Sequence, residues 1–449
     1  MKKILLFALL LSIPFAAIPQ DSLNVSLLYQ WSDNTLPASF VGNTYNEVWG
    51  FVQGGREYAV IGTTMGTHIF DVTTPTASTL VVFIPGPTQG QQIIHRDYHD
   101  YNGYLYMVTD EGWGVSTLEI ADLSFLPSSA PIVYSSNTLF SISHNIFIDT
   151  AKARLYACSP DYITTLGVYD ISTPANPVFL GTVNLPDFSH DIFVRNDTAW
   201  INVGGSGLLI YDVSNVSSPQ LIGSLTSYPH QGYNHSGWLN DDGSVYALAD
   251  EDHGLKVKVL NVSNLGNIQL HDTIGTEVHP LSIPHNLIIK GDYLFVSYYY
   301  DGFYIWDISD PNNPVITGWY DTCTLPHQND YEGAWGVYPL LPSGIVLVSD
   351  MQEGLFVFDV SQAVSIGVKE QDNPPQLRIF PNPTTGVFTV TGATEPVQVF
   401  DLLGRQVKPS GIPARGGQAG SSIHFDLSSY PAGIYFVKVG DAVRKLVKQ

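Results

Sequence analysis

The chain of 449 residues is short of several kinds of residue, and each shortage excludes a class of protein. It contains only two cysteines, Cys158 and Cys323, which excludes a disulfide-rich scaffold and leaves open whether the two pair. Lys and Arg number 19 against 41 Asp and Glu, so the chain lacks the basic surface that binding to nucleic acid requires. Residues 21–375 hold 37 of these acids and suit a soluble exported surface or a binder of cations.

Long apolar runs are missing after the first 20 residues. Residues 1–20 begin with Met-Lys-Lys, continue with an apolar stretch and end in small residues, which is the pattern of a signal peptide. A membrane anchor is the alternative, but the apolar run is shorter than the roughly 20 residues that a spanning helix needs. We therefore predict an exported protein without a transmembrane segment in its mature chain.

Sequence signatures of common catalytic sites are also missing. The chain has no H-E-x-x-H or C-x-x-C spacing, no phosphate-binding loop and no nucleophile elbow. The glycine-rich stretch at 204–207 directly precedes a strand pattern and is interpreted as a turn. No catalytic residue is therefore assigned from the sequence.

The chain does have an internal repeat of about 45 to 50 residues. Each unit contains an apolar run, a turn rich in Gly, Asn or Asp, and a second apolar run, which predicts a β-hairpin. A third run, such as GLLIYDVS, and a fourth, such as PQLIGSLTS, follow most of the hairpins. The seven units open at Trp49, His99, His144, His190, His235, His285 and Trp335.

Seven units of four strands predict an all-β fold, a seven-bladed β-propeller of four-stranded blades. A β-solenoid is the alternative, but its repeats are shorter. The last unit has no clear fourth strand, whereas residues 25–33 resemble one. We therefore expect this N-terminal segment to complete the seventh blade, which would leave no open sheet edge where the ring closes.

The opening residues of the units are candidates for a site at the channel mouth, because the first strand of each propeller blade lines the central channel. The predicted partial ring consists of His99, His144, His190, His235 and His285, with Trp49 and Trp335 in the two remaining places. The neighbouring His95, Arg96 and Asp97 complete the set of candidate ligand-binding residues. Arg96 is expected to pair with Asp97 or a carboxylate of the next blade, or to bind an anionic ligand.

A divalent metal is one candidate ligand, since acidic loops are expected on the same face as the histidines. The candidate metal ligands are His99, His144, His190, His235, His285, Asp110, Glu111, Asp250 and Glu251. Imidazole together with carboxylate favours zinc, manganese or iron, and carboxylates alone favour calcium. The alternative is that each histidine only bonds neighbouring loops, as a structural feature copied with the repeat.

Several motifs carry a resemblance to known families. Units that end in GLLIYDVS, GFYIWDIS and GLFVFDVS resemble the LVIVD repeat. The stretch of roughly residues 25–361, with HRDYHDYNGYLYMVTDEG and IPHNLIIKGDYLFVSYYYDGFYIWDIS, resembles the choice-of-anchor B family. That resemblance implies a propeller and a secreted or surface-attached protein, and it implies no catalytic activity.

The C-terminal part predicts a separate module. Residues 362–375 are polar, end in two prolines and are interpreted as a linker. Residues 376–449 alternate apolar and polar residues between Gly and Pro turns, which predicts a small β-sandwich. The motifs PNPTTG, LLGR and YPAGIYFVKV resemble the type A sorting domain of the type IX secretion system of Bacteroidetes. A carbohydrate-binding sandwich is the alternative.

Taken together, the sequence predicts a signal peptide (1–20), a propeller (21–361), a linker (362–375) and a sorting domain (376–449). The sorting domain implies that the secretion machinery is one partner and that the protein crosses the periplasm to the cell surface or the medium. We expect a binding or adhesion module for an extracellular protein or glycan. A metal-dependent hydrolase or lyase with its site on the same face, and a structural scaffold, are the alternatives.

Overall fold

The computed structural model describes residues 22–365, 378–391, 396–402, 404–408, 410–412, 423–439 and 442–449. The predicted signal peptide and most of the predicted linker lie outside these residues. The chain divides after Val364 into two compact units, and each is described by itself.

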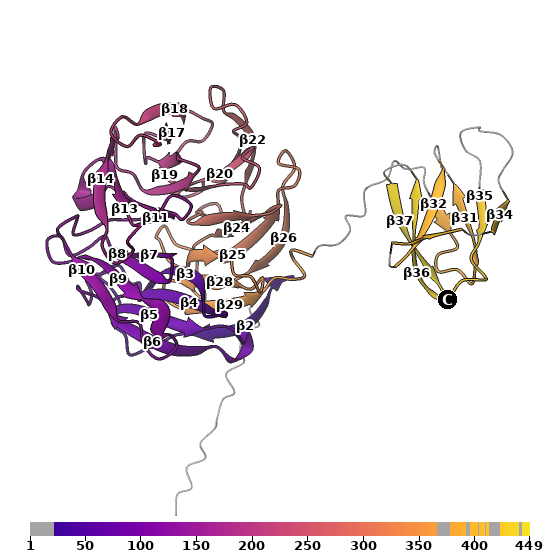
Figure 1. Ribbon diagram of the computed structural model, residues 1–449, viewed down its shortest axis with the longest axis horizontal. Helices are drawn as coiled ribbons and strands as arrows, with labels where there is room; N and C mark the ends of the chain where they lie inside the picture. Colours follow the sequence, from indigo (N-terminus) through magenta and orange to yellow (C-terminus); the bar gives the residue numbers. More distant parts are fainter. Residues whose placement is uncertain are drawn as a thin grey trace, which may run out of the picture. The chain divides into compact units, whose positions relative to one another are not determined.

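The first unit is a seven-bladed β-propeller, with its antiparallel sheets arranged around a central axis (Figure 1). Blade 1 consists of β3 (Tyr45–Gln53), β4 (Arg56–Thr63), β5 (Gly66–Asp71) and β6 (Thr79–Pro85). Blade 2 consists of β7 (Arg96–Tyr101), β8 (Tyr104–Thr109), β9 (Leu118–Asp122) and β10 (Ile132–Ser136). Blade 3 consists of β11 (Ile146–Asp149), β12 (Arg154–Cys158), β13 (Thr165–Asp170) and β14 (Val178–Asn184). Three short 3₁₀ helices, η1 (Pro75–Ala77), η2 (Leu123–Phe125) and η3 (Pro160–Tyr162), lie in its loops.

The remaining blades follow the same order. Blade 4 consists of β15 (Asp191–Arg195), β16 (Thr198–Asn202), β17 (Leu208–Asp212) and β18 (Gln220–Leu225), and blade 5 of β19 (Asn234–Leu239), β20 (Val245–Asp250), β21 (Val257–Asn261) and β22 (Gln269–Ile274). Blade 6 consists of β23 (Leu287–Lys290), β24 (Tyr293–Ser297), β25 (Phe303–Asp307) and β26 (Val315–Tyr320). Blade 7 contains β27 (Ala334–Tyr338), β28 (Val346–Asp350) and β29 (Gly354–Asp359).

The N-terminal strands complete the ring. Strand β2 (Ser26–Trp31) pairs with β29 as the fourth strand of blade 7, which confirms the prediction for residues 25–33. Strand β1 (Ser22–Leu23) adds a fifth strand to blade 6 beside β26. Trp31 then packs on Phe70 of blade 1, with ring centroids 4.9 Å apart, so the start of the chain joins the last blade to the first.

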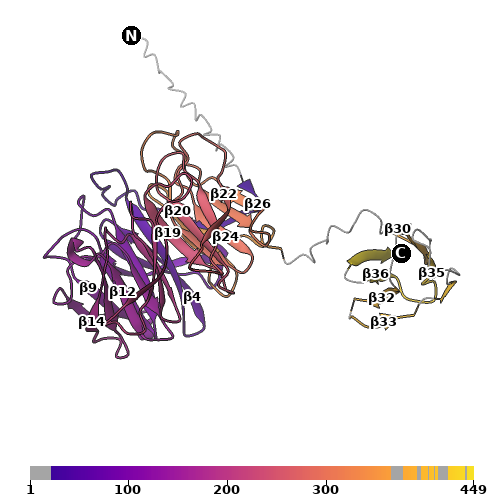
Figure 2. The same ribbon diagram turned by 90° about the horizontal axis from the view of Figure 1, so that it is seen from above.

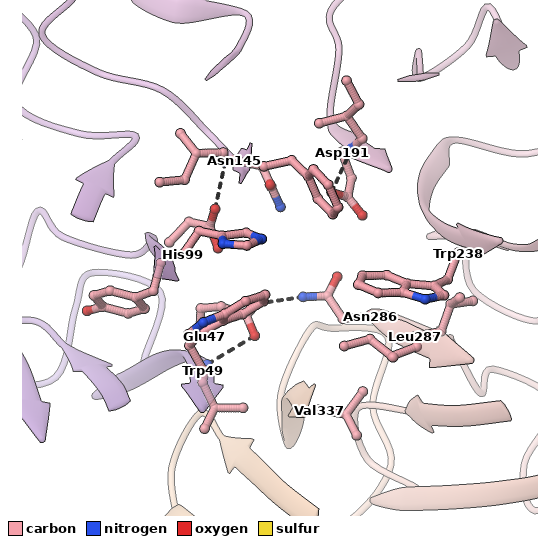
Figure 3. Close-up of a pocket in the computed structure, with 16 residues that line it drawn as sticks. Glu47, Trp49, His99, Asn145, Asp191, Trp238, Asn286, Leu287 and Val337 are labelled. Carbon is pink, nitrogen blue, oxygen red and sulfur yellow. Dashed lines mark hydrogen bonds between the residues drawn. The ribbon is translucent and has the colours of Figure 1, made fainter. Parts of the chain in front are cut away.

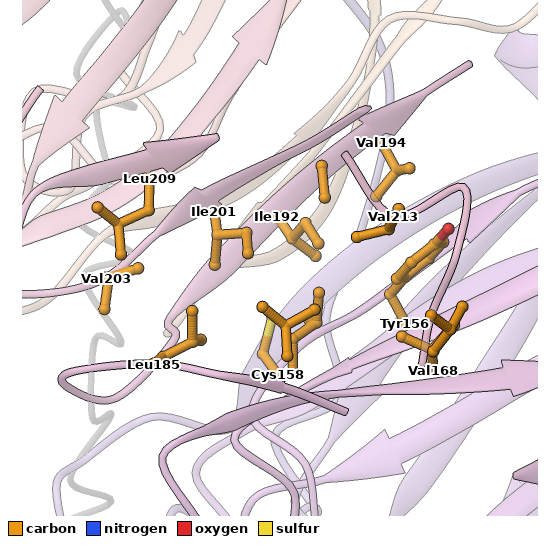
Figure 4. Close-up of a cluster of buried hydrophobic side chains, with 14 residues drawn as sticks. Tyr156, Cys158, Val168, Leu185, Ile192, Val194, Ile201, Val203, Leu209 and Val213 are labelled. Carbon is orange, nitrogen blue, oxygen red and sulfur yellow. The ribbon is translucent and has the colours of Figure 1, made fainter. Parts of the chain in front are cut away.

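Apolar side chains fill the space between neighbouring blades. Between blades 3 and 4, Val168, Ile192 and Ile201 are buried side by side (Figure 4). Burial of an aliphatic side chain of this size contributes about 1.5–3 kcal/mol. Because a single blade cannot cover its own two faces, the blades are stable only as a closed stack.

A local hydrogen bond explains the recurrent Asp-Val/Ile-Ser ending of the third strand. The carboxylates of Asp170 and Asp212 accept the backbone N–H of Ser172 and Ser214 at 2.7 and 2.8 Å. Such a bond holds the chain in a turn between the third and fourth strands. The motif therefore positions strands and does not contribute to the channel.

The second unit is a small β-sandwich, as predicted for the C-terminal residues. One sheet has the order β30-β31-β35-β34 and the other β33-β32-β36-β37 (Figure 2). The strands are β30 (Arg378–Phe380), β31 (Val387–Thr391), β32 (Val397–Asp401), β33 (Gln406–Val407), β34 (Ser410–Ile412), β35 (Ile423–Asp426), β36 (Gly433–Val439) and β37 (Ala442–Lys448). Phe388, Val399 and Val437 form part of the buried core of this unit.

Candidate functional site

Five histidines and one tryptophan form a continuous ring where the first strands of the blades begin. We call it the histidine ring, and neighbouring side-chain rings in it lie 3.9–5.3 Å apart between centroids. Its members in order are His95, His144, His190, His235, His285 and Trp335. All six line one cavity of about 20 Å³, which is large enough for a water molecule or a metal ion.

Two residues predicted for the ring lie elsewhere. Trp49 and His99 pack on each other at 4.3 Å and belong to a second layer, the aromatic floor. The members of the aromatic floor are Trp49, His99, Phe147, Phe193, Trp238 and Tyr338. The prediction was wrong because His99 is paired with Tyr106 inside its hairpin, whereas His144 precedes the first paired residue of its strand. His95 takes the place in the ring that was assigned to His99.

A polar layer lines a cavity of about 60 Å³ together with residues of the aromatic floor (Figure 3). Most of its members also line the cavity of the histidine ring, so the layer lies between ring and floor. Its members are Glu47, Asp97, Asn145, Asp191 and Asn286. Asn286 Nδ2 donates to Glu47 Oε2 across the channel at 2.5 Å, and Asp97 Oδ2 accepts the N–H of Ile146 in the next blade at 2.6 Å. The first bond joins blades 6 and 1 across the channel, and the second joins the neighbouring blades 2 and 3, so the layer has a structural role.

Sequence reasoning missed most of the polar layer. Only Asp97 was named, although Asn145, Asp191 and Asn286 each directly follow a ring histidine and carried a visible signal. Burial raises the pKa of Asp97 and of Asp191 to about 7, and it raises the pKa of Glu47 well above its usual value. Part of this buried acidic charge is therefore neutralised by protons near neutral pH.

The more exposed side of the histidine ring consists of imidazole–carboxylate pairs. His95 Nδ1 lies 2.7 Å from Glu111 Oε1, and His144 Nδ1 lies 2.9 Å from Asp110 Oδ2. Burial opposes protonation of His144, but the charge of Asp110 and this hydrogen bond raise the pKa of the imidazole overall. Asp110 and Glu111 therefore lie at the ring, as the sequence predicted.

The more buried side of the ring has imidazole nitrogens without a hydrogen-bonding partner. The Nδ1 atoms of His190 and His235 are buried and form no hydrogen bond in the described part of the chain. Burial lowers the pKa of both imidazoles well below the usual value, so they are neutral and keep a lone pair. Leaving such a nitrogen without a partner is costly, and a ligand would remove that cost.

Glu251 supplies the carboxylate of this buried side. Its Oε2 lies 3.5 Å from His235 Nε2, and its Oε1 lies 3.8 Å from His285 Nε2 and accepts the hydroxyl of Tyr299. His285 Nδ1 is bonded to the carbonyl oxygen of Trp335 at 2.6 Å, which orients the imidazole. Burial raises the pKa of Glu251 to about 7.

Among the described residues, two groups of three have the composition of a metal site. In each group the possible ligand atoms lie within 4.8 Å of one another. One group is His95, His144 and Asp110, and the other is His190, His235 and Glu251. Two imidazoles and one carboxylate suit zinc and iron and leave coordination positions open.

Other candidates are engaged elsewhere. Arg96 is buried beside the cavity of the histidine ring, and its guanidinium donates to the backbone carbonyls of Thr63 and Thr88 at 2.8 and 2.7 Å instead of pairing with Asp97. Asp250 lies in the interior beside Lys258 and does not reach the ring, because consecutive strand residues point to opposite faces and Glu251 takes the channel side. Cys158 and Cys323 are both buried and free.

Comparisons with known proteins agree with the architecture. Residues 189–227 and 284–322 match the LVIVD repeat, and residues 378–449 match the secretion system C-terminal sorting domain. No curated protein matches the chain. The chain thus carries LVIVD repeats in its propeller and a type IX sorting domain, which implies export to the cell surface or the extracellular space. No helix in the described residues is long and apolar enough to cross a membrane.

Proposed function

We propose that the chain is an exported binding module that holds a divalent transition-metal ion in its histidine ring. The sorting domain supports delivery outside the cell through the secretion machinery. The metal would lie at the face of the propeller from which an extracellular protein or glycan could be bound. Calcium fits this ring less well than zinc, because imidazole nitrogen outnumbers carboxylate oxygen in both ligand groups.

One observation carries the proposal: two buried, neutral imidazoles with unpartnered nitrogens beside a carboxylate. His68 also has a buried Nδ1 without a partner, but it lies alone between Trp31 and Phe83, whereas His190 and His235 lie side by side and share a carboxylate, Glu251. A bound cation would satisfy these nitrogens and would also balance the charge of Glu251 and of the polar layer below.

The test is metal analysis of the mature chain, residues 21–449, after dialysis against trace metals. We expect stoichiometric transition metal in the native chain and its loss in His235→Gln. His271→Gln is the matched control, because His271 is half-buried and bonded to Asn312 away from the ring. A folded native chain that retains no transition metal would contradict the proposal.

Export through the sorting domain is tested separately. Deletion of residues 376–449 should leave the folded propeller in the periplasm, because the signal for the outer-membrane step is removed. Fractionation of cells that express the full-length and the truncated chain measures this. Display of the truncated chain at the surface at normal levels would contradict the role of the domain.

Metal-dependent hydrolysis is a second candidate function, and the open coordination positions favour it. A metal-bound water at neutral pH is a nucleophile, and the His95 side of the ring, where the side chain is 25% exposed, admits solvent. Assay of the zinc-loaded chain on ester and glycoside substrates, with a chelated sample as control, tests this. Turnover that is equal in the two samples would exclude metal catalysis.

A further inference from the structure

We propose that the histidine ring holds two metal ions, a buried one bound by His190, His235 and Glu251 and an open one bound by His95, His144 and Asp110. This inference rests on the proposed metal-binding function and extends it to a two-ion centre. The ligands it would take are first-row transition-metal ions such as Zn²⁺ or Co²⁺, and the two ions would occupy neighbouring places on one ring.

The size of the ring argues against a single central ion. Six side-chain rings with centroids 3.9–5.3 Å from their neighbours form an approximate hexagon. The centre of a hexagon is as far from its corners as the corners are from each other. A central ion would lie about 3 Å or more from the nearest nitrogens, against roughly 2.0–2.1 Å for a zinc–nitrogen bond. Ions must therefore lie off centre, each near its own pair of imidazoles.

The two ligand groups share no residue but lie next to each other. The rings of His144 and His190, one from each group, are 3.9 Å apart between centroids. Each group has two imidazoles and one carboxylate, so each can bind an ion without the other. Two ions on adjacent ligand groups are the arrangement used in two-metal hydrolytic sites.

The two places differ in access to solvent. The side chain of His235 is 3% exposed, and Tyr299 covers this side by its bond to Glu251. On the other side, the His95 side chain is 25% exposed, while the carboxylates of the two groups are covered alike, Asp110 at 14% and Glu251 at 16% exposed. The open ion would therefore exchange with solvent and face a bound substrate, and the buried ion would be shielded.

The two places also differ in what a metal must displace. Asp110 and His144 are bonded to each other without a metal, as are Glu111 and His95, so an ion there competes with existing bonds. In the other group, His235 Nε2 lies 3.5 Å from Glu251 Oε2, and the buried Nδ1 atoms of His190 and His235 form no hydrogen bond in the described residues, so an ion there displaces weaker contacts. We therefore expect the buried place to bind first and more tightly, by at least tenfold.

The test is titration of the metal-free full mature chain with Co²⁺, followed by calorimetry, visible absorption and metal analysis. The native chain should bind two equivalents in two phases. Asp110→Asn and His95→Gln should each remove the weaker phase and keep the tighter one. His190→Gln and Glu251→Gln should each remove the tighter phase. Circular dichroism and thermal melting identify any variant that fails to fold, and His271→Gln is the control.

The outcomes separate this inference from the function on which it rests. Two phases, with magnetic coupling between two Co²⁺ ions in the loaded chain, would support the two-ion centre. A single equivalent in the native chain, or loss of both phases in the folded Asp110→Asn variant, would overturn the two-ion centre and leave the metal-binding function standing. A native chain that binds no Co²⁺ would overturn both.

Discussion

The histidine ring and the aromatic floor come from the same first strands, yet their histidines lie in different environments. In the floor, His99 packs between Trp49 and Phe147, and its Nδ1 bonds the carbonyl oxygen of Asp100 at 3.2 Å. Burial lowers its pKa to about 4, as expected of a packed neutral imidazole. In the ring, imidazoles contact imidazoles and carboxylates, and two buried nitrogens have no partner in the described residues.

This comparison separates packing from ligand binding within one molecule. A histidine that only fills space, such as His99 or His68, lies among apolar aromatic rings, away from other imidazoles. A group of adjacent imidazoles gains nothing from mutual packing that apolar side chains would not provide, and burying their nitrogens adds a cost. The proposed cation would account for burying these groups together.

The largest expected effect is on metal affinity. Changing both His190 and His235 to Gln should weaken binding at the buried place at least 1000-fold, equivalent to about 4 kcal/mol, because two of its three ligands are lost. His99→Phe, in the floor, should leave the affinity unchanged. Calorimetry with Zn²⁺ measures both variants, and equal losses in the two would remove the distinction between the layers.

The opposite test changes the aromatic floor and measures the free energy of unfolding. Trp49→Ala removes a large side chain from the aromatic floor and should lower the free energy of unfolding by about 3–5 kcal/mol. It also removes the indole donor that bonds Asp100 at 2.9 Å. Metal stoichiometry should stay the same below the melting temperature. Chemical denaturation gives the stability, and a Trp49→Ala chain that loses metal while folded would show that the layers act together.

Acidification should reveal the contribution of a structural histidine, His68, that belongs to neither the ring nor the floor. His68 lies between Trp31 and Phe83, and burial lowers its pKa to about 4 from 6.5. The unfolded chain binds a proton at His68 more readily than the folded chain does. The stability that neutral His68 contributes is therefore complete above pH 6.5 and is lost as the pH falls towards 4. It amounts to about 3 kcal/mol. The stability of His68→Leu should therefore fall less than that of the native chain between pH 7 and 4, and parallel curves would contradict this assignment.

The smallest expected effect is on metal affinity at the buried place, through the hydrogen bond that Tyr299 donates to Glu251. Tyr299→Phe removes the hydroxyl that bonds Glu251 and keeps the ring that packs on His285 at 4.9 Å. Loss of such a supporting bond should weaken metal binding by about tenfold without changing the stoichiometry. Tyr300→Phe is the matched control, since its hydroxyl bonds Glu332. Equal affinities in the two variants would show that Glu251 needs no support from Tyr299.

Much of the fold could be predicted because its signals are local. The two apolar runs around a Gly or Asn turn define each hairpin, and the Asp–Ser pair that ends the third strand forms a hydrogen bond two residues along the chain. Closure of the ring by β2 was also predictable, because the last repeat lacked a fourth strand and residues 25–33 resembled a fourth strand that belonged to no repeat. The recurrence of histidine predicted four of the five ring histidines in place.

The depth of each residue in the channel was not predictable in the same way. Asn145, Asp191 and Asn286 follow ring histidines in sequence, but Glu47 follows none, and only the closed propeller brings it to the same layer. The roles of Arg96 and Asp250 depended on neighbours that are distant in sequence, such as Thr63 for Arg96. Residue types and spacing alone cannot specify such contacts.

The sequence by itself determined seven repeated units, their strands, a C-terminal sorting module and a concentration of histidine and carboxylate at the strand starts. These follow from periodicity and from bonds within a few residues. Only the tertiary structure decided that His95 joins the ring and His99 the floor, and that, among the described residues, two imidazole nitrogens of the ring are buried without a hydrogen bond. The physical reason is that strand register and contacts between blades are set by packing around the whole circle, which no single repeat contains.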